Sequence, residues 1–369
     1  MSFIRSLRYK SINNGAIRGF GLIELMIALA LGTVIILGVT TLFSDSSRAL
    51  NDINRAGRYV ENSLYAMDLI SKDVALVGYW GEANALLPPD NPNFGALRAA
   101  EIGDLNATGY PNAPPPLCVG TGATGFDPRI ELGWAMAYPL LAGQGLEEDV
   151  EAGVDPCNPS GSTAWSKVDY VAVRRASTCA LGDNCRPVGD FFHLQTNGCN
   201  DPNANLIGGE VKLYQVSGDT VESTLDYRRY GCDEVAPVYR FVSRLYFVNY
   251  ADELVRLYLN EIDGATLYQQ EVLVEGIEVL RFQWHIDDTG DGEYDRVETG
   301  LPYQDAANVV GVKIWLMVRD TSPRAGYSDP NTPYEIAGET WAVPDGRETY
   351  PRVLQTRMVM LPNRVGQRR

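Results

Sequence analysis

The chain has 369 residues, a formal net charge of -16 and no histidine-rich, collagen-like or low-complexity character. This length is enough for one large domain or two smaller ones. The acidic balance argues against nucleic acid and anionic membrane surfaces as partners, because both are bound by basic patches.

The N-terminal region changes from basic to apolar at Arg18-Gly19-Phe20. Residues 1–19 contain no acid, and their basic residues are Arg5, Arg8, Lys10 and Arg18. This distribution predicts that they stay in the cytoplasm. From residue 20 to residue 43 the chain is apolar or small except at Glu24, and the charge-free part can cross ~30 Å of hydrocarbon as a helix. A secretory signal would be shorter and would end in a small-residue cleavage site, so we expect the apolar run to stay on the mature protein.

Glu24 is a costly residue in such a helix. A charge at this depth costs on the order of 2.5 to 3.5 kcal/mol by insertion scales, so the carboxylate is expected to have a partner. Cleavage after Gly19 would create one, because the new amino group of Phe20 would lie about one helical turn from Glu24. In a packed bundle the carboxylate of one subunit could meet the amine of the next.

The residues from Gly19 onward read G-F-G-L-I-E-L-M-I-A-L-A-L. This motif resembles the class III leader of type IV pilins and type II secretion pseudopilins, whose usual form is G-F-[T/S]-L-[I/V]-E. The resemblance implies that a prepilin peptidase cuts after Gly19 and methylates Phe20, and that Glu24 is the assembly carboxylate. Gly21 stands where a hydroxyl residue is common, but none of the three key positions is affected.

A second helical pattern follows the apolar run. Apolar and small residues recur at a spacing of three to four, at Leu50, Ile53, Gly57, Val60, Leu64, Met67, Ser71 and Val74. Gly78 is a plausible stop. One helix from about residue 21 to residue 77 would be roughly 85 Å long, apolar all round in its first half and amphipathic in its second.

Residues 81–165 are rich in proline, glycine and asparagine and predict an irregular, disulfide-pinned excursion. The G-x-G-x-x-G spacing at residues 120–125 lacks the strand and helix that a dinucleotide site requires, so we interpret it as a loop. The six cysteines predict disulfides in a translocated domain, and a zinc site is disfavoured because there is no C-x-x-C pair and histidine is scarce. Sequence cannot choose among 15 pairings; closure of short loops favours Cys118 with Cys157, Cys179 with Cys185, and Cys199 with Cys232.

From residue 168 the apolar pattern has period two, which predicts strands. The expected strands are Val168 to Arg174, Val211 to Val216, Val238 to Val248, Glu253 to Leu259, Leu267 to Val274, Ile277 to Ile286, Val309 to Val318 and Arg352 to Leu361. The simplest product is a predominantly antiparallel sheet that packs one face on the amphipathic half of the helix.

The stretch from Asp287 to Glu298 has metal-ligand spacing. Oxygen ligands fall in the order of a calcium loop, with glycine at position six; they are Asp287, Thr289, Asp291, Glu293, Asp295 and Glu298. The alternative is an acidic, glycine-containing turn between strands, which the flanking patterns favour. No other cofactor is indicated.

Motifs for catalysis are missing from the sequence: there is no G-x-S-x-G elbow, no H-E-x-x-H and no P-loop. His193 and His285 are expected to be structural or surface residues. We therefore predict that the chain is not an enzyme.

The order of elements also resembles the larger minor members of the pilin family. The length, the A-L-A-L-G sequence after Glu24, the step from Val274 to Ile277 and the D-x-T-x-D-G loop support this resemblance. It implies an α+β, type IV pilin-like fold, with a long N-terminal helix on a predominantly antiparallel sheet head that carries long disulfide-containing loops. The expected parts are a cleaved leader (1–19), a transmembrane helix half (20–43), an amphipathic half (44–79) and a periplasmic or extracellular head (80–369).

The same resemblance implies a minor pilin that helps to prime type IV pili and is incorporated into them, with roles in twitching motility and adhesion. Its expected partners are the prepilin peptidase, other minor pilins, the major pilin, the inner membrane and a tip adhesin. It is expected to start as a single-pass inner-membrane protein with a periplasmic head, and then to reach the pilus and cell surface. The alternatives are a type II secretion minor pseudopilin and an adhesive binding head, for which the aromatic-rich loops between residues 81 and 235 are the hint.

Overall fold

The computed structural model describes residues 21–81, 117–118, 132, 135–136, 138–143, 169–181, 192–201, 210–217, 220–221, 226–249, 251–262 and 265–363. By its internal contacts the chain divides into two compact units, residues 1–55 and residues 56–369. We call the second unit the head.

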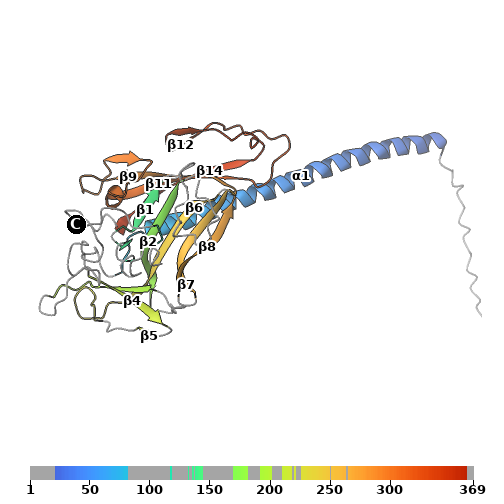
Figure 1. Ribbon diagram of the computed structural model, residues 1–369. Helices are drawn as coiled ribbons and strands as arrows, with labels where there is room; N and C mark the ends of the chain where they lie inside the picture. Colours follow the sequence, from blue (N-terminus) through green and yellow to red (C-terminus); the bar gives the residue numbers. More distant parts are fainter. Residues whose placement is uncertain are drawn as a thin grey trace, which may run out of the picture. The chain divides into compact units, whose positions relative to one another are not determined.

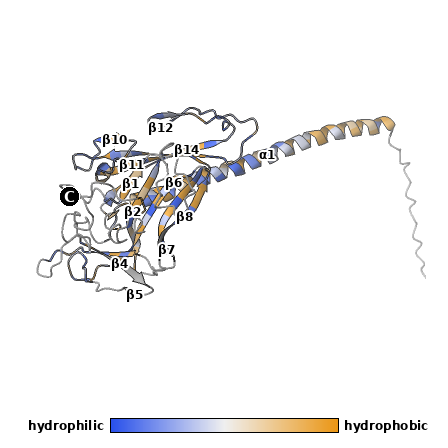
Figure 2. Cartoon of the chain, viewed as in Figure 1, coloured by the Kyte–Doolittle hydropathy of each residue, from blue (hydrophilic) through white to orange (hydrophobic). Residues whose placement is uncertain are grey.

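The first element is α1, Leu22–Ala75, a helix that runs from the first unit into the head. Its early residues are apolar and its later residues are mixed in polarity (Figure 2). It contains a stretch that is long and apolar enough to cross a membrane. A turn with positive φ at Gly78 follows its end, so the helix stops where a glycine stop was predicted.

The head is built from antiparallel strands (Figure 1). An eight-stranded sheet contains β1 (Leu140–Gly143), β2 (Tyr170–Ala180), β3 (Phe192–Thr196), β4 (Val211–Ser217), β5 (Thr220–Val221), β6 (Val238–Val248), β7 (Glu253–Ile262) and β8 (Ala265–Glu275). A four-stranded sheet has the order β10 (Arg296–Glu298), β9 (Ile277–Ile286), β11 (Val309–Arg319) and β14 (Arg352–Met360). A short 3-10 helix, η3 (Asp305–Asn308), precedes β11, and β12 (Tyr334–Ile336) pairs with β13 (Glu339–Trp341).

Gly276 is the single residue between the last strand of the larger sheet and the first strand of the smaller one. Its φ is +84°, and a Cβ atom at this position would lie 2.6 Å from the carbonyl oxygen of Arg319. The Gly276 carbonyl in turn accepts the Arg319 N–H at 2.8 Å. Only glycine therefore fits where the chain passes between sheets.

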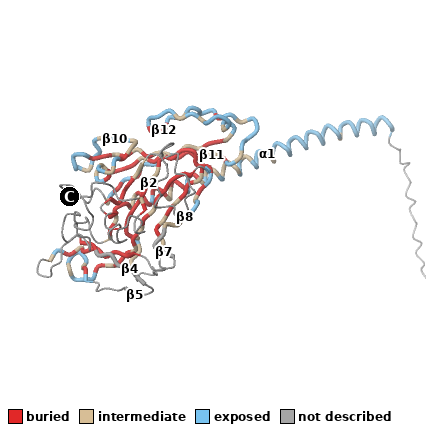
Figure 3. Tube along the Cα trace, in the orientation of Figure 1, coloured by how far each residue is buried: buried red, intermediate tan, exposed pale blue. Residues whose placement is uncertain are grey.

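The principal core lies where the head part of α1 meets both sheets. Ala66, Met67, Ile70 and Val74 of α1 are fully or almost fully buried, and they share one cluster with residues of both sheets such as Val171 and Phe282. Figure 3 shows this buried interior in red. The predicted packing of an antiparallel sheet on the amphipathic half of the helix is confirmed, although the strands form two larger sheets rather than one.

The predicted helix face was partly wrong. Leu64 was placed on the buried face but is 48% exposed. The buried stripe passes instead through Ser63, Ala66, Met67, Ile70, Ser71, Asp73 and Val74. The stripe therefore includes a carboxylate that the apolar spacing did not use.

Candidate assembly site

Glu24 lies in the first turn of α1 on an apolar, exposed surface. Its neighbours Leu22, Ile23 and Leu25 are 78%, 73% and 56% exposed. The threonine hydroxyls of this stretch donate hydrogen bonds to backbone carbonyls of the helix itself, as Thr33 does to Ala30 at 2.8 Å. The Glu24 carboxylate differs from them because it carries a charge on an apolar surface. No described residue of the chain forms an ion pair with Glu24. Gly19 and Phe20, the predicted cleavage and methylation residues, lie outside the described residues.

Asp73 anchors the head end of α1 to the eight-stranded sheet. Its side chain is buried, and both of its oxygens accept bonds from Arg244 Nη1, at 2.7 and 2.8 Å. Arg175 Nη2 donates to the same carboxylate at 2.9 Å, and the Tyr246 hydroxyl donates as well. Burial alone would raise the pKa of Asp73, but Arg244 and Arg175 more than offset it and the pKa is lowered.

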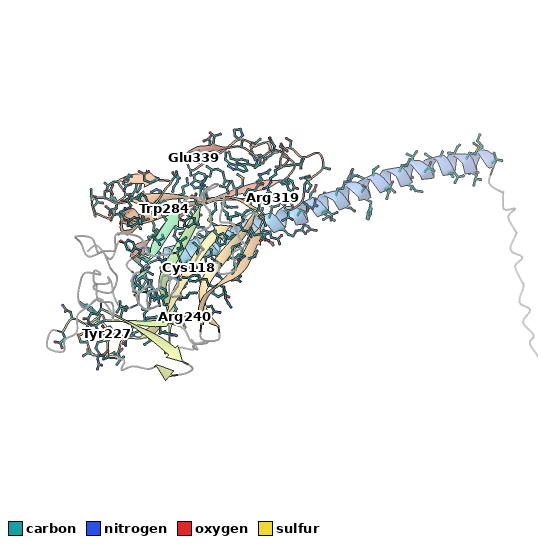
Figure 4. All side chains as sticks on the ribbon, viewed as in Figure 1. Cys118, Tyr227, Arg240, Trp284, Arg319 and Glu339 are labelled. Carbon is teal, nitrogen blue, oxygen red and sulfur yellow. A yellow bond between two sulfur atoms is a disulfide. The ribbon has the colours of Figure 1, made fainter. Side chains whose placement is uncertain are left out.

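A second ionic cluster fixes the segment between β11 and β14 onto the smaller sheet. Arg352 from β14 is completely buried at its side chain and donates to Glu278 of β9, with Nε 2.6 Å from Oε2. Arg347 reaches Asp252 at 2.7 Å and Glu278 at 3.3 Å. Arg319, labelled in Figure 4, joins Asp252 at 3.0 Å from the end of β11. These contacts tie residues 320–351, which carry β12 and β13, to the strands beneath them.

Cys199 and Cys232 form a disulfide, as predicted, with a Cα–Cα distance of 4.9 Å. Asn197 supports it, because its side-chain amide donates to the Cys199 carbonyl at 2.9 Å and its oxygen accepts from the Arg228 N–H. Cys118 and Cys179 are also disulfide-bonded. Cys157 and Cys185 lie outside the described residues, so the pairings Cys118–Cys157 and Cys179–Cys185 remain predictions.

The acidic loop from Asp287 to Glu298 is held by its own backbone. Asp287 is buried and accepts N–H bonds from Gly290 and Gly292. Asp295 accepts from the N–H groups of Asp288 and Thr289 at 2.8 and 3.0 Å. The Asp291 side chain accepts a hydrogen bond from the Glu293 N–H at 2.8 Å.

The structure does not gather these ligand candidates into a metal centre. Among the described residues no group of three or more histidine, cysteine, aspartate or glutamate side chains could hold a metal ion. Glu298 contacts Arg296 at 3.4 Å instead of pointing to a shared site. Calcium binding by this loop stays a prediction.

Two comparisons with protein families identify regions of the chain. Residues 245–363 match the sequence model of the family described as Type IV Pilus-assembly protein W, or PilW. Residues 15–40 match the prokaryotic N-terminal methylation motif. Together these matches support a PilW-like type IV minor pilin. The PilW match begins within β6 and ends just after β14, so it contains the whole four-stranded sheet.

Other comparisons add less. A solved structure, a type IV-like pilin from Thermus thermophilus, is 14% identical, covers 53% of this chain and 79% of that chain, and has a TM-score of 0.25. With so low a TM-score, the α+β assignment rests on the helix and strands described above. Comparison with curated protein sequences found no match. Proteins of the pilin-like kind are in general structural rather than catalytic.

The sequence interpretation missed the two ionic anchors. The partners of Asp73 lie 102 and 171 residues away in the chain, so no local pattern identifies them. The one signal in the sequence is that Asp73 lies directly before Val74 and two residues after Ser71, which the helical spacing places on the buried face.

Proposed function

We propose that this minor pilin is processed after Gly19, inserts the apolar first half of α1 into the inner membrane as a single span with a periplasmic head, and joins a complex of minor pilins that primes the pilus. The observation that carries the proposal is the pairing of an N-terminal methylation motif at residues 15–40 with a PilW match at residues 245–363. The first supplies the processing signal and the second supplies the kind of head.

Glu24 is the residue through which we expect entry into the filament. It is the one carboxylate in an apolar stretch of α1, and no described residue of its own chain pairs with it. Cleavage after Gly19 would provide the amine of Phe20, and a neighbouring subunit would provide it in the geometry of a packed bundle. Desolvated charges need such partners in a membrane or a filament core.

The test is mass spectrometry of the N-terminal peptide of this protein in pili sheared from cells. A peptide that begins with methylated Phe20 is expected. Glu24→Ala should be cleaved normally but be strongly depleted from sheared pili, and Asp45→Ala, which removes an acid outside the apolar run, is the matched control. Retention of Met1 throughout, or normal incorporation of Glu24→Ala, would refute the proposal; processed protein found only in the envelope, with export rather than pili lost on deletion, would favour the pseudopilin alternative.

A further inference from the structure

The four-stranded sheet has two faces with different coverings. Leu280, Phe282 and Trp284 of β9 point into the principal core. The alternate residues of the three longer strands form the outer face. Part of that face packs beneath the β12–β13 hairpin, in a cluster that includes Val279, Met317, Ile336 and Ala337, with Trp315 and Leu354 against it.

The end of the outer face nearest β10 carries an apolar group that no described residue covers. Strand register puts Val297, His285, Gly311 and Met360 in one row across all four strands, and Met358 in the next row. Tyr294 stacks edge-on against His285, with ring centroids 4.6 Å apart. Val297, Met358, Met360 and Tyr294 are 43%, 46%, 55% and 56% exposed. We call the following six residues the outer patch: His285, Tyr294, Val297, Gly311, Met358 and Met360.

Gly311, at the centre of the outer patch, has no side chain and leaves room there for the neighbouring methionines. A Cβ atom there would lie 2.8 Å from Met358 Cε and 3.4 Å from Met360 Sδ, so both methionines fold over the glycine. Methionine adapts its shape to a partner more readily than branched side chains do. Lys313, in the row of Met358, points its ammonium over the Trp315 ring at 4.2 Å, toward the covered half.

The hairpin cannot slide across to cover the patch. The segment that carries it is tied at its start by the ion pair of Arg319 with Asp252 and at its end by that of Arg352 with Glu278. An exposed apolar surface that none of the described residues covers indicates an interaction site.

The charge beside the patch specifies what would cover it. The acidic loop from Asp287 to Glu298 contains six carboxylates and one cation, Arg296. That cation is already engaged by Asp288, Glu298 and Asp305, at 2.8, 3.4 and 2.9 Å. Asp291 and Glu293 remain exposed. An anionic lipid surface would be repelled, and a second copy would bring an equally acidic chain to the same place.

We propose that the outer patch is the docking surface for a different pilin chain, whose contact surface has an apolar centre bordered by lysine and arginine side chains. The inference rests on the proposed function, because it assumes that the protein meets other pilins. The methionines and Tyr294 would be buried at the centre of the interface, and Asp291 and Glu293 would pair with the basic border.

The first experiment places a photoreactive p-benzoylphenylalanine at position 360 in the full chain in cells. The expected result is a crosslink to another chain that carries a methylated prepilin-type N-terminus, on a peptide that contains lysine or arginine. Glu293→Lys should reduce this crosslink several-fold, because it places a like charge against the basic border of the partner. Glu335→Lys on β12, an exposed acid away from the patch, is the matched control and should leave it unchanged. A crosslink to a second copy of this chain, or none above the unirradiated sample, would overturn the proposal.

The second experiment separates this inference from the proposed function. A strain that lacks the protein is complemented with wild type, with Met358→Asp/Met360→Asp, or with Met358→Leu/Met360→Leu, and surface pili are counted at matched protein abundance. We expect the aspartate pair to restore about tenfold fewer pili than the leucine pair. If the aspartate pair restores wild-type numbers, the docking surface is wrong and the proposed function stands. If the deletion itself leaves pili unchanged, the proposed function fails and the docking role fails with it.

Discussion

Asp73→Ala is the change that should most weaken the attachment of α1 to the eight-stranded sheet. The substitution removes a buried carboxylate and leaves the guanidinium groups of Arg175 and Arg244 and the hydroxyl of Tyr246 without their common acceptor. Breaking a buried pair by removing one partner costs about 3 to 5 kcal/mol, because a desolvated charge is left uncompensated. We expect a loss of this size in the free energy of unfolding.

The measurement is urea unfolding of the full chain in detergent, followed by tryptophan fluorescence. Trp80 and Trp284 are both 1% exposed, so unfolding moves them into water. Asp68→Ala is the matched control, because it removes an acid from the same helix. Asp68 pairs at the surface with Lys72 and, at 3.7 Å, with Arg357 of β14. Exposed pairs contribute little, so this variant should unfold close to wild type. A loss of less than about 1 kcal/mol for Asp73→Ala, or equal losses for the two variants, would refute the view that this cluster anchors the helix.

The pH dependence gives the same cluster an independent signature. The pKa of Asp73 is lowered in the folded protein, so its contribution is present above the unfolded pKa of about 3.9 and is lost as pH falls through the folded value. The stability gap between wild type and Asp73→Ala should therefore be widest near neutral pH and should close in acid. A gap that stays constant down to about pH 2 would contradict the charge argument.

Three further changes test other parts of the head. Gly276→Ala should lower stability by about 2 to 4 kcal/mol in the same unfolding assay, because it combines a strained φ with a Cβ 2.6 Å from the Arg319 carbonyl oxygen. Burial raises the pKa of Asp169 to about 6, although Arg281 favours the charged form. Its contribution to the free energy of unfolding is therefore full below about pH 3.8 and is lost as pH rises through about 6. Over this window the wild type should lose up to ~3 kcal/mol relative to Asp169→Asn, and parallel pH profiles of the two proteins would contradict this. Cys199→Ser should cost about 2 to 4 kcal/mol by opening the loop that it closes with Cys232, and no shift in the urea midpoint would argue against that role.

Long strands with regular alternation were predictable from the sequence. The predicted ranges 238–248 and 277–286 agree with β6 and β9. β9 alternates between buried and half-buried residues along its second half. β6 is buried on both faces at its end, where Tyr246 lies in the principal core and Leu245 lies in another cluster, and its continuous apolar run is typical of such a strand. The short strands β1, β3, β5, β10, β12 and β13 were missed. β3 offers only two apolar residues, Phe192 and Leu194, although the fold buries all five of its residues. The strands of two to four residues are too short to show a period.

The candidate site divides in the same way. Gly19, Phe20 and Glu24 form a local motif, and a local motif is readable without a structure. The partners of Asp73 come from strands more than a hundred residues away, so only the fold brings them together. The acidic loop is an intermediate case. Its spacing fits both a calcium loop and an acidic turn between strands, and in the structure Asp287 and Asp295 accept hydrogen bonds from backbone N–H groups of the loop.

The end of β14 carries a signal that becomes interpretable only with the fold. Met358, Val359 and Met360 form an apolar run in an edge strand, whereas a strand with one solvated face should alternate apolar and polar residues. Val359 is 6% exposed and belongs to the principal core, while Met358 and Met360 point to the opposite face and are half exposed. A run that is apolar on both faces is typical of a strand buried on both sides, and the described residues of this chain bury only one of them. This is the reason that we expect another pilin to supply the second covering and to dock at this edge of the sheet rather than at the disulfide-linked end.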